Sequence, residues 1–152
     1  MKIRKTASFN FEIKNQRYIK YIIIHYTGMN NQRLAIKRLQ SKVAKVSAHY
    51  LISKRGTVYQ MVEDKNIAWH AGKSQWGKDI NLNNKSIGIE IVNTGKEAFP
   101  KDQIKQLLKL LKILSKKYKI KNKNILGHSD IAPNRKKDPG PLFPWEGIRN
   151  LI

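Results

Sequence analysis

Two short runs of β-branched residues are the most apolar parts of the chain. Residues 21–26 are rich in isoleucine and are closed by Gly28, and residues 87–92 carry isoleucine at every second position. Short apolar runs of this kind predict central strands covered on both faces. Weaker strand patterns occupy residues 48–53, 57–62 and 125–126. Gly56, between the first two of these, suits a positive φ and predicts a hairpin.

Apolar residues spaced three and four apart predict two helices. The first follows Asn30 or Asn31, either of which can cap it. Its apolar side comprises Ala35, Ile36, Leu39 and Val43. The second begins at Pro100, and its apolar stripe comprises Ile104, Leu107, Leu108, Leu111 and Leu114. Its other side carries a row that we call the lysine face: Lys105, Lys109, Lys112 and Lys116.

Strands alternating with helices predict an α/β fold, with one central mixed β-sheet flanked by helices. Residues 1–19 are interpreted as a basic lead-in, and residues 20–152 as the folded domain. Residues 67–84 form a long irregular segment with two glycines and two tryptophans, and such segments often serve function. From His128 onward, the frequent prolines and glycines predict loop.

Composition narrows the function. The chain has 152 residues, 40% of them apolar, which predicts one domain with a real core. Its 31 basic and 10 acidic side chains give a charge of +21, which indicates a polyanionic partner or simply A/T-rich codons. No cysteine is present, so disulfides and thiolate chemistry are excluded. No helix-turn-helix, RRM or KH pattern is recognisable, so no specific nucleic-acid partner is expected.

No apolar run approaches the roughly 18 residues that a membrane span needs, so we expect no membrane-spanning segment. The basic residues 1–5 are not followed by the apolar segment of a signal peptide. We therefore expect a soluble monomer, cytoplasmic by default, with export to the envelope if a leader has been removed.

Three residues near predicted strand ends could bind a metal. His25 ends the first central strand, His128 follows the strand at 125–126, and Asp138 comes ten residues later. Ligands gather beyond the carboxyl ends of strands in open α/β sheets. Two imidazoles and a carboxylate are a possible three-ligand zinc set with a fourth position free. A core histidine and a loop-capping aspartate are the alternative.

Glu90 interrupts the second central strand. Alternation places it with Gly88 and Val92, on the face opposite the isoleucines. A carboxylate in a strand covered on both sides must be paired, close to a metal or raised in pKa, and each case suits an active site. An edge strand with Glu90 in solvent is the alternative.

Six motifs occur in order at residues 21–27, 46–52, 68–72, 86–91, 127–132 and 135–140, and Phe143-Pro144-Trp145 follows. Together they closely resemble the type 2 N-acetylmuramoyl-L-alanine amidases. That family includes bacterial muropeptide amidases, phage lysozyme-type amidases and animal peptidoglycan recognition proteins. The resemblance covers residues 20–148 and implies a peptidoglycan-recognition-protein-like amidase fold.

The resemblance also implies roles for particular residues. One zinc ion per chain is expected on His25, His128 and Asp138, where the family's third ligand is either cysteine or aspartate. The family's catalytic glutamate falls on Glu90, and its basic catalytic residue falls on Lys136. Residues matched to substrate contact are His49, Tyr50, Trp69, His70, Ala71 and Gly72.

These matches imply a zinc amidase acting on peptidoglycan or muropeptide fragments. Family members cleave the amide between the lactyl group of N-acetylmuramic acid and the L-alanine of the stem peptide. Both 1,6-anhydro-muropeptides and intact walls remain possible substrates. A non-catalytic peptidoglycan-binding module is the alternative; such members lack a zinc ligand, and no matching ligand position is lost here.

Overall fold

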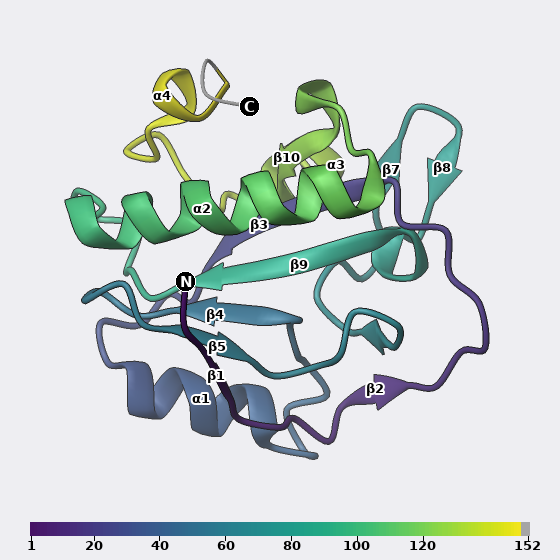
Figure 1. The fold of residues 1–152 in the computed structure, drawn as a ribbon, viewed down its shortest axis with the longest axis horizontal. Helices are drawn as coiled ribbons and strands as arrows, with labels where there is room; N and C mark the ends of the chain where they lie inside the picture. Colours follow the sequence, from purple (N-terminus) through teal and green to yellow (C-terminus); the bar gives the residue numbers. More distant parts are fainter. Residues whose placement is uncertain (150–152) are drawn as a thin grey trace.

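A mixed six-stranded sheet organises the computed structural model, which describes residues 1–149. Its strands are, in spatial order, β1 (Ile3–Lys5), β5 (Val58–Gln60), β4 (Tyr50–Ile52), β9 (Ser86–Ile91), β3 (Tyr21–Tyr26) and β10 (Ile125–Gly127). The β4–β5 pair is the predicted antiparallel hairpin, and the other neighbouring pairs are parallel (Figure 1). The predicted fold class is confirmed. The last three residues of the predicted domain, 150–152, lie outside the described residues.

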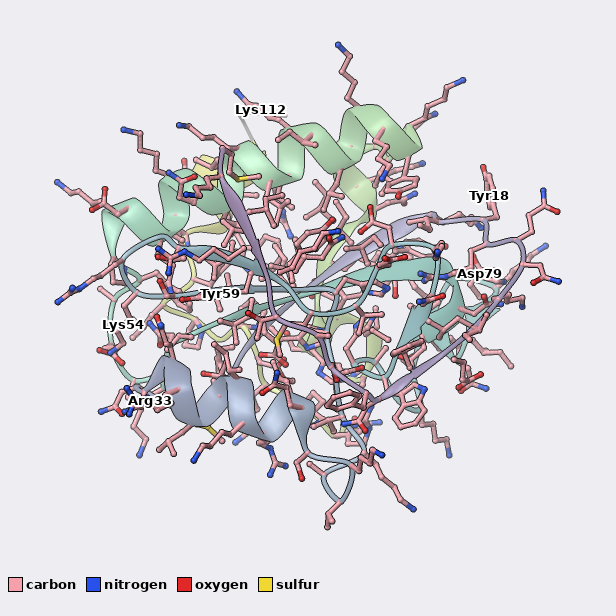
Figure 2. The ribbon with its side chains drawn as sticks, turned by 60° about the horizontal axis from the view of Figure 1, so that its bottom comes forward. Tyr18, Arg33, Lys54, Tyr59, Asp79 and Lys112 are labelled. Carbon is pink, nitrogen blue, oxygen red and sulfur yellow. The ribbon has the colours of Figure 1, made fainter. Side chains whose placement is uncertain are left out.

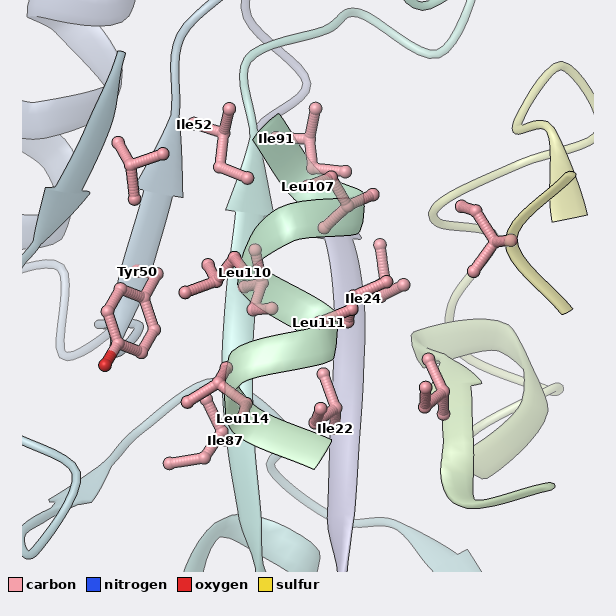
Figure 3. Packing of buried hydrophobic residues seen from close by; sticks show 14 of the residues in the cluster. Ile22, Ile24, Tyr50, Ile52, Ile87, Ile91, Leu107, Leu110, Leu111 and Leu114 are labelled. Atoms are coloured by element: carbon pink, nitrogen blue, oxygen red, sulfur yellow. The ribbon is translucent and has the colours of Figure 1, made fainter. Parts of the chain in front are cut away.

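Helix α2 (Lys101–Tyr118) covers one face of the sheet and forms the main core with it. Leucines of α2 at 107, 110, 111 and 114 pack on isoleucines of β3 and β9 (Figure 3). Alternation along β9 therefore directs its isoleucines towards α2 and leaves Gly88, Glu90 and Val92 for the other face, as predicted.

Helix α1 (Gln32–Gln40) lies on the opposite side of the sheet from α2 (Figure 1). Of the two predicted caps, Asn31 is the one used: its side chain accepts hydrogen bonds from the backbone N–H groups of Arg33 and Leu34. Ala35 and Leu39 are buried. Val43 was predicted on the same apolar side, and this is wrong, because the helix ends at Gln40 and Val43 is 91% exposed.

Several short elements escaped the sequence pattern. The basic lead-in contributes edge strand β1, and also β2 (Phe11–Glu12), which pairs with β6 (Ile67–Ala68). The irregular segment also contains β7 (Gln75–Trp76), β8 (Asp79–Ile80) and the 3₁₀ turn η1 (Leu82–Lys85). The 3₁₀ turn η2 (Asn122–Asn124) precedes β10. Beyond it, α3 (His128–Ile131) and α4 (Trp145–Arg149) replace the predicted loop. Elements of two to five residues are too short to show a periodicity.

Arg17 ties the lead-in to the loops around the sheet. Its guanidinium donates hydrogen bonds to five backbone carbonyls, those of Asp64, Asn66, Asn83, Asn84 and Ser86. No sequence pattern indicates this role of Arg17, because its acceptors are backbone carbonyls, which every residue carries.

The lysine face lies on the outer side of α2, where Figure 2 labels Lys112. All four lysines are exposed, and within residues 1–149 none of them joins an ion pair. Among the same residues, no helix is both long and apolar enough to cross a membrane.

Candidate functional site

The candidate site lies on the sheet face opposite α2, between two separate apolar clusters. One cluster packs α1 against Leu51, Tyr59 and Val92, and the other packs Ile131 of α3 against Tyr21 and Ile23. His25 on β3 and Glu90 on β9 lie in the gap, where the sheet register pairs them directly. A cleft of about 450 Å³ opens over them.

Three side chains from distant parts of the chain converge in this cleft. His25 Nδ1 lies 3.0 Å from His128 Nδ1 and 2.9 Å from Asp138 Oδ2, and the last two atoms are 3.2 Å apart. His25 is placed by β3, and His128 begins α3 directly after β10. Asp138 is held by its own carbonyl, which accepts a hydrogen bond from the Ser129 N–H at 2.9 Å. All three side chains are buried.

The three ligand atoms fit a tetrahedral cation. Atoms about 2.0–2.1 Å from zinc at tetrahedral angles lie about 3.3 Å apart, close to the separations found here. Burial lowers the pKa of His25 to about 4, so its imidazole is neutral at neutral pH, as a metal ligand must be. Two nitrogens and one carboxylate oxygen without cysteine suit a catalytic zinc site with one position open.

Glu90 is a half-buried residue with one buried, unpartnered carboxylate oxygen. Its strand lies between β4 and β3, so the alternative of an edge strand in solvent is wrong. Its Oε2 is buried and has no hydrogen-bond partner among the described residues. Burial raises the pKa of Glu90 well above its ordinary value, the charge of Asp138 adds to the rise, and Lys136 and Arg38 oppose it. Such a group can take up a proton inside the cleft.

Basic side chains surround the same cleft. Lys136 is half-buried and Lys137 is exposed, and both line the cleft together with Arg38. Arg135 also lines it and was not singled out from the sequence, where it was one more basic residue. Its Nη2 donates hydrogen bonds to the carbonyls of Ala71 and Lys73, at 2.8 and 2.7 Å.

Two of the six residues matched to substrate contact line the cleft, Trp69 and His70. The Trp69 indole N–H donates to Glu12 Oε1 at 3.0 Å, so strand β2 helps to fix this wall. Gly72 is exposed with φ of +57°, beside the Arg135 guanidinium. Ala71 is buried, and its carbonyl faces His128 Nε2 at 3.1 Å.

The structure places the other two predicted contacts, His49 and Tyr50, away from the cleft. His49 is completely buried, with Nδ1 accepting from the Gly88 N–H at 3.0 Å and Nε2 facing the Asn66 carbonyl at 3.1 Å. The Tyr50 hydroxyl donates to Asp64 at 2.6 Å on the α2 side of the sheet. Both side chains are buried and hydrogen-bonded within the protein, so a substrate has no access to them.

Comparison with known proteins settles the family. Residues 15–141 match the family described as N-acetylmuramoyl-L-alanine amidase. The chain belongs to the type 2 N-acetylmuramoyl-L-alanine amidase family. The match covers the strands that carry His25 and Glu90, as well as His128, Lys136 and Asp138.

Individual members of the family agree with this assignment. The chain is 40% identical to the Escherichia coli (strain K12) N-acetylmuramoyl-L-alanine amidase AmiD over 86% of its own length. It is 44% identical to the 1,6-anhydro-N-acetylmuramyl-L-alanine amidase AmpD of the same organism over 71% of its length. It spans only 52% and 59% of these two relatives.

A solved structure of AmiD from E. coli in complex with the substrate anhydro-N-acetylmuramic acid-L-Ala-D-γ-Glu-L-Lys shares the fold. The TM-score is 0.83 at 33% identity, over 93% of this chain and 65% of that one. The amidase family and its fold are therefore common to both chains.

Proposed function

We propose that this chain is a zinc-dependent amidase that hydrolyses the amide between the lactyl group of (anhydro-)N-acetylmuramic acid and the L-alanine of a stem peptide. The observation that carries the proposal is the convergence of His25, His128 and Asp138 beside the unpartnered carboxylate of Glu90. Family membership supports it, and so do relatives named for cleavage of this bond.

One zinc ion per chain would be held by His25 Nδ1, His128 Nδ1 and Asp138 Oδ2. When bound there, zinc supplies Lewis acidity, which polarises a carbonyl and makes water acidic near neutral pH. The two neutral imidazoles and one carboxylate leave a net positive site, which preserves that acidity.

Glu90 is proposed to carry the proton. Hydrolysis adds the oxygen of water to the lactyl carbonyl carbon and breaks the bond from that carbon to the alanine nitrogen. Glu90 accepts the proton that the attacking water loses and delivers it to the leaving nitrogen. Its unpartnered Oε2 leaves it free for both transfers.

Lys136 is proposed to stabilise the negative charge that develops on the carbonyl oxygen. It lines the cleft and is half-buried, whereas its neighbour Lys137 is exposed. A partly desolvated cation interacts more strongly with a developing oxyanion than a solvated one does.

Muropeptides are the proposed substrate because two relatives of the chain are named for binding or cleaving them. AmiD binds an anhydro-N-acetylmuramic acid tripeptide, and AmpD is named as a 1,6-anhydro-N-acetylmuramyl-L-alanine amidase. A cleft of about 450 Å³ can take the sugar–peptide junction of such a molecule.

Product mass spectrometry on anhydromuropeptides and on intact sacculi, digested in parallel, tests the proposal. We expect free stem peptides that begin with L-alanine, loss of activity with chelator and recovery with Zn²⁺. Metal analysis is expected to find one zinc per chain, and His25→Ala is expected to reduce that content. Zinc binding without cleavage of either substrate would favour the alternative of a non-catalytic binding module.

A further inference from the structure

The His70 imidazole lies between His25, a proposed zinc ligand, and Ser86, the first residue of β9. Its Nδ1 lies 3.0 Å from His25 Nε2, and its Nε2 lies 3.2 Å from Ser86 Oγ. The ring is edge-on to His25 with centroids 5.2 Å apart, and the residue is only 8% exposed. Both ring nitrogens are therefore occupied within the protein, although one edge of the ring reaches the cleft.

The direction of these hydrogen bonds follows from the Leu82 carbonyl, which lies at the end of the series His25–His70–Ser86–Leu82. Ser86 Oγ lies 2.6 Å from the carbonyl of Leu82, which can only accept, so the serine hydroxyl donates there. The serine then offers His70 a lone pair, and His70 Nε2 must carry the proton. A neutral imidazole has only one N–H proton, so His70 Nδ1 carries none (it is bare) and accepts a hydrogen bond from His25 Nε2–H. His25 Nδ1 is left bare, facing the metal position.

His128, the second proposed histidine ligand, is oriented by Ala71, the residue that follows His70. His128 Nε2 lies 3.1 Å from the Ala71 carbonyl, which only accepts, so the proton of His128 is on Nε2 and its Nδ1 is bare. Arg135 also donates to this carbonyl, at 2.8 Å, and holds it in place. The dipeptide His70-Ala71 thus faces the outer nitrogen of both imidazoles.

The fold fixes this dipeptide from two sides. Asn83 Oδ1 accepts hydrogen bonds from the backbone N–H groups of His70 and Ala71, at 3.0 and 2.7 Å. Gly88 on β9 leaves room for the imidazole, since a Cβ at that position would lie 2.3 Å from His70 Cγ. The His70 ring therefore lies against the strand backbone and has little freedom to turn.

We propose that His70 is a positioning residue for the metal site, which holds His25 in the tautomer with Nδ1 bare, rather than a wall that contacts substrate. The inference rests on the proposed function, because it assigns His25 to zinc. Outer hydrogen-bond partners of this kind fix ring orientation and raise ligand basicity, and their loss commonly weakens metal affinity about 10–100-fold.

Two substitutions separate hydrogen bonding from packing. His70→Leu fills the space but offers no acceptor, whereas His70→Asn places Oδ1 near the position of Nδ1 and can accept from His25. We expect zinc affinity, measured by competition with a chromophoric chelator, to fall about 10–100-fold in His70→Leu and to recover largely in His70→Asn. His49→Asn is the matched control: His49 is another buried histidine, 5.7 Å from His70 by ring centroid, with no contact to a proposed zinc ligand. Its zinc affinity should stay close to that of the unaltered protein.

The tautomer itself can be read without any substitution. In the zinc-loaded protein, imidazole ¹⁵N chemical shifts should show a protonated Nε2 and an Nδ1 without a proton on both His25 and His128. A proton on His25 Nδ1 would overturn the inference, and so would equal zinc affinity in His70→Leu or equal losses in the Leu and Asn variants. If the unaltered protein binds no zinc, the proposed function fails; if it binds zinc and His70→Leu binds zinc equally well, only the role of His70 fails.

Discussion

Replacing Glu90 by glutamine should change activity and stability in opposite directions. Glutamine has nearly the same shape but cannot accept the proton of the attacking water. Loss of a general base costs about 10²–10⁴ in kcat, equivalent to about 3–5 kcal/mol of transition-state stabilisation. Zinc content should be unchanged, because Glu90 is not among the three converging ligands. The measurement is kcat on a soluble anhydromuropeptide, with zinc quantified in the same samples.

The stability change follows from the environment of Glu90. Burial raises the pKa of the folded-state carboxyl well above its ordinary value of 4.5. The folded protein therefore binds this proton more tightly than the unfolded chain does, and the favourable contribution is complete only below the unfolded pKa. As pH rises through the folded pKa, the contribution is lost, at up to about 1.4 kcal/mol per pH unit. Glutamine cannot ionise, so the Glu90→Gln protein does not lose this contribution to its free energy of unfolding as pH rises.

Urea unfolding in the presence of chelator, at several pH values, tests this reasoning. Above pH 4.5 the Glu90→Gln protein should become progressively more stable than the unaltered protein. Glu97→Gln is the control, since the half-buried Glu97 pairs with Lys54 at 2.9 Å, and this hydrogen bond lowers the pKa of Glu97. The control should show a small effect of the opposite sign. A stability difference for Glu90→Gln that does not change with pH would refute the raised pKa of Glu90, and near-normal turnover would remove Glu90 from the reaction.

Three further expectations address other parts of the molecule. Lys136→Ala should lower kcat on a soluble muropeptide with less effect on KM, whereas exposed Lys137→Ala should be mild; equal losses would mean that bulk charge is responsible. Arg17→Ala leaves five backbone carbonyls without their donor and should destabilise by about 3 kcal/mol or more in urea unfolding, against about 0.5 kcal/mol or less for exposed Arg33→Ala on the outer side of α1 (Figure 2). If the lysine face steers the protein to anionic walls, salt should weaken adsorption to sacculi, and glutamine at its four positions should reproduce that loss at low salt. Turnover of a small muropeptide should barely change, and equal salt sensitivity for both substrates would leave the lysine face as a solvated helix surface.

The sequence alone was sufficient for the strongly periodic elements. The isoleucine runs predicted β3 and β9, and the leucine stripe predicted α2, because local hydrophobic periodicity reports which face of an element is buried. Alternation also placed Glu90 on the face opposite α2, where the structure has it. The order of the six motifs indicated the family, which the comparison confirmed.

Tertiary structure decided how the site is assembled. His25 lies 103 residues from His128 and 113 from Asp138, and only the parallel pairing of β3 with β10 brings the first two together. No sequence pattern marked β1 either, because its pairing with β5 joins residues 55 positions apart through backbone groups. The same reason explains why the sequence could not show that His49 is buried away from the cleft or that His70 contacts His25. Their ring nitrogens meet backbone groups, Ser86 and another histidine, and such contacts exist only once the chain has folded.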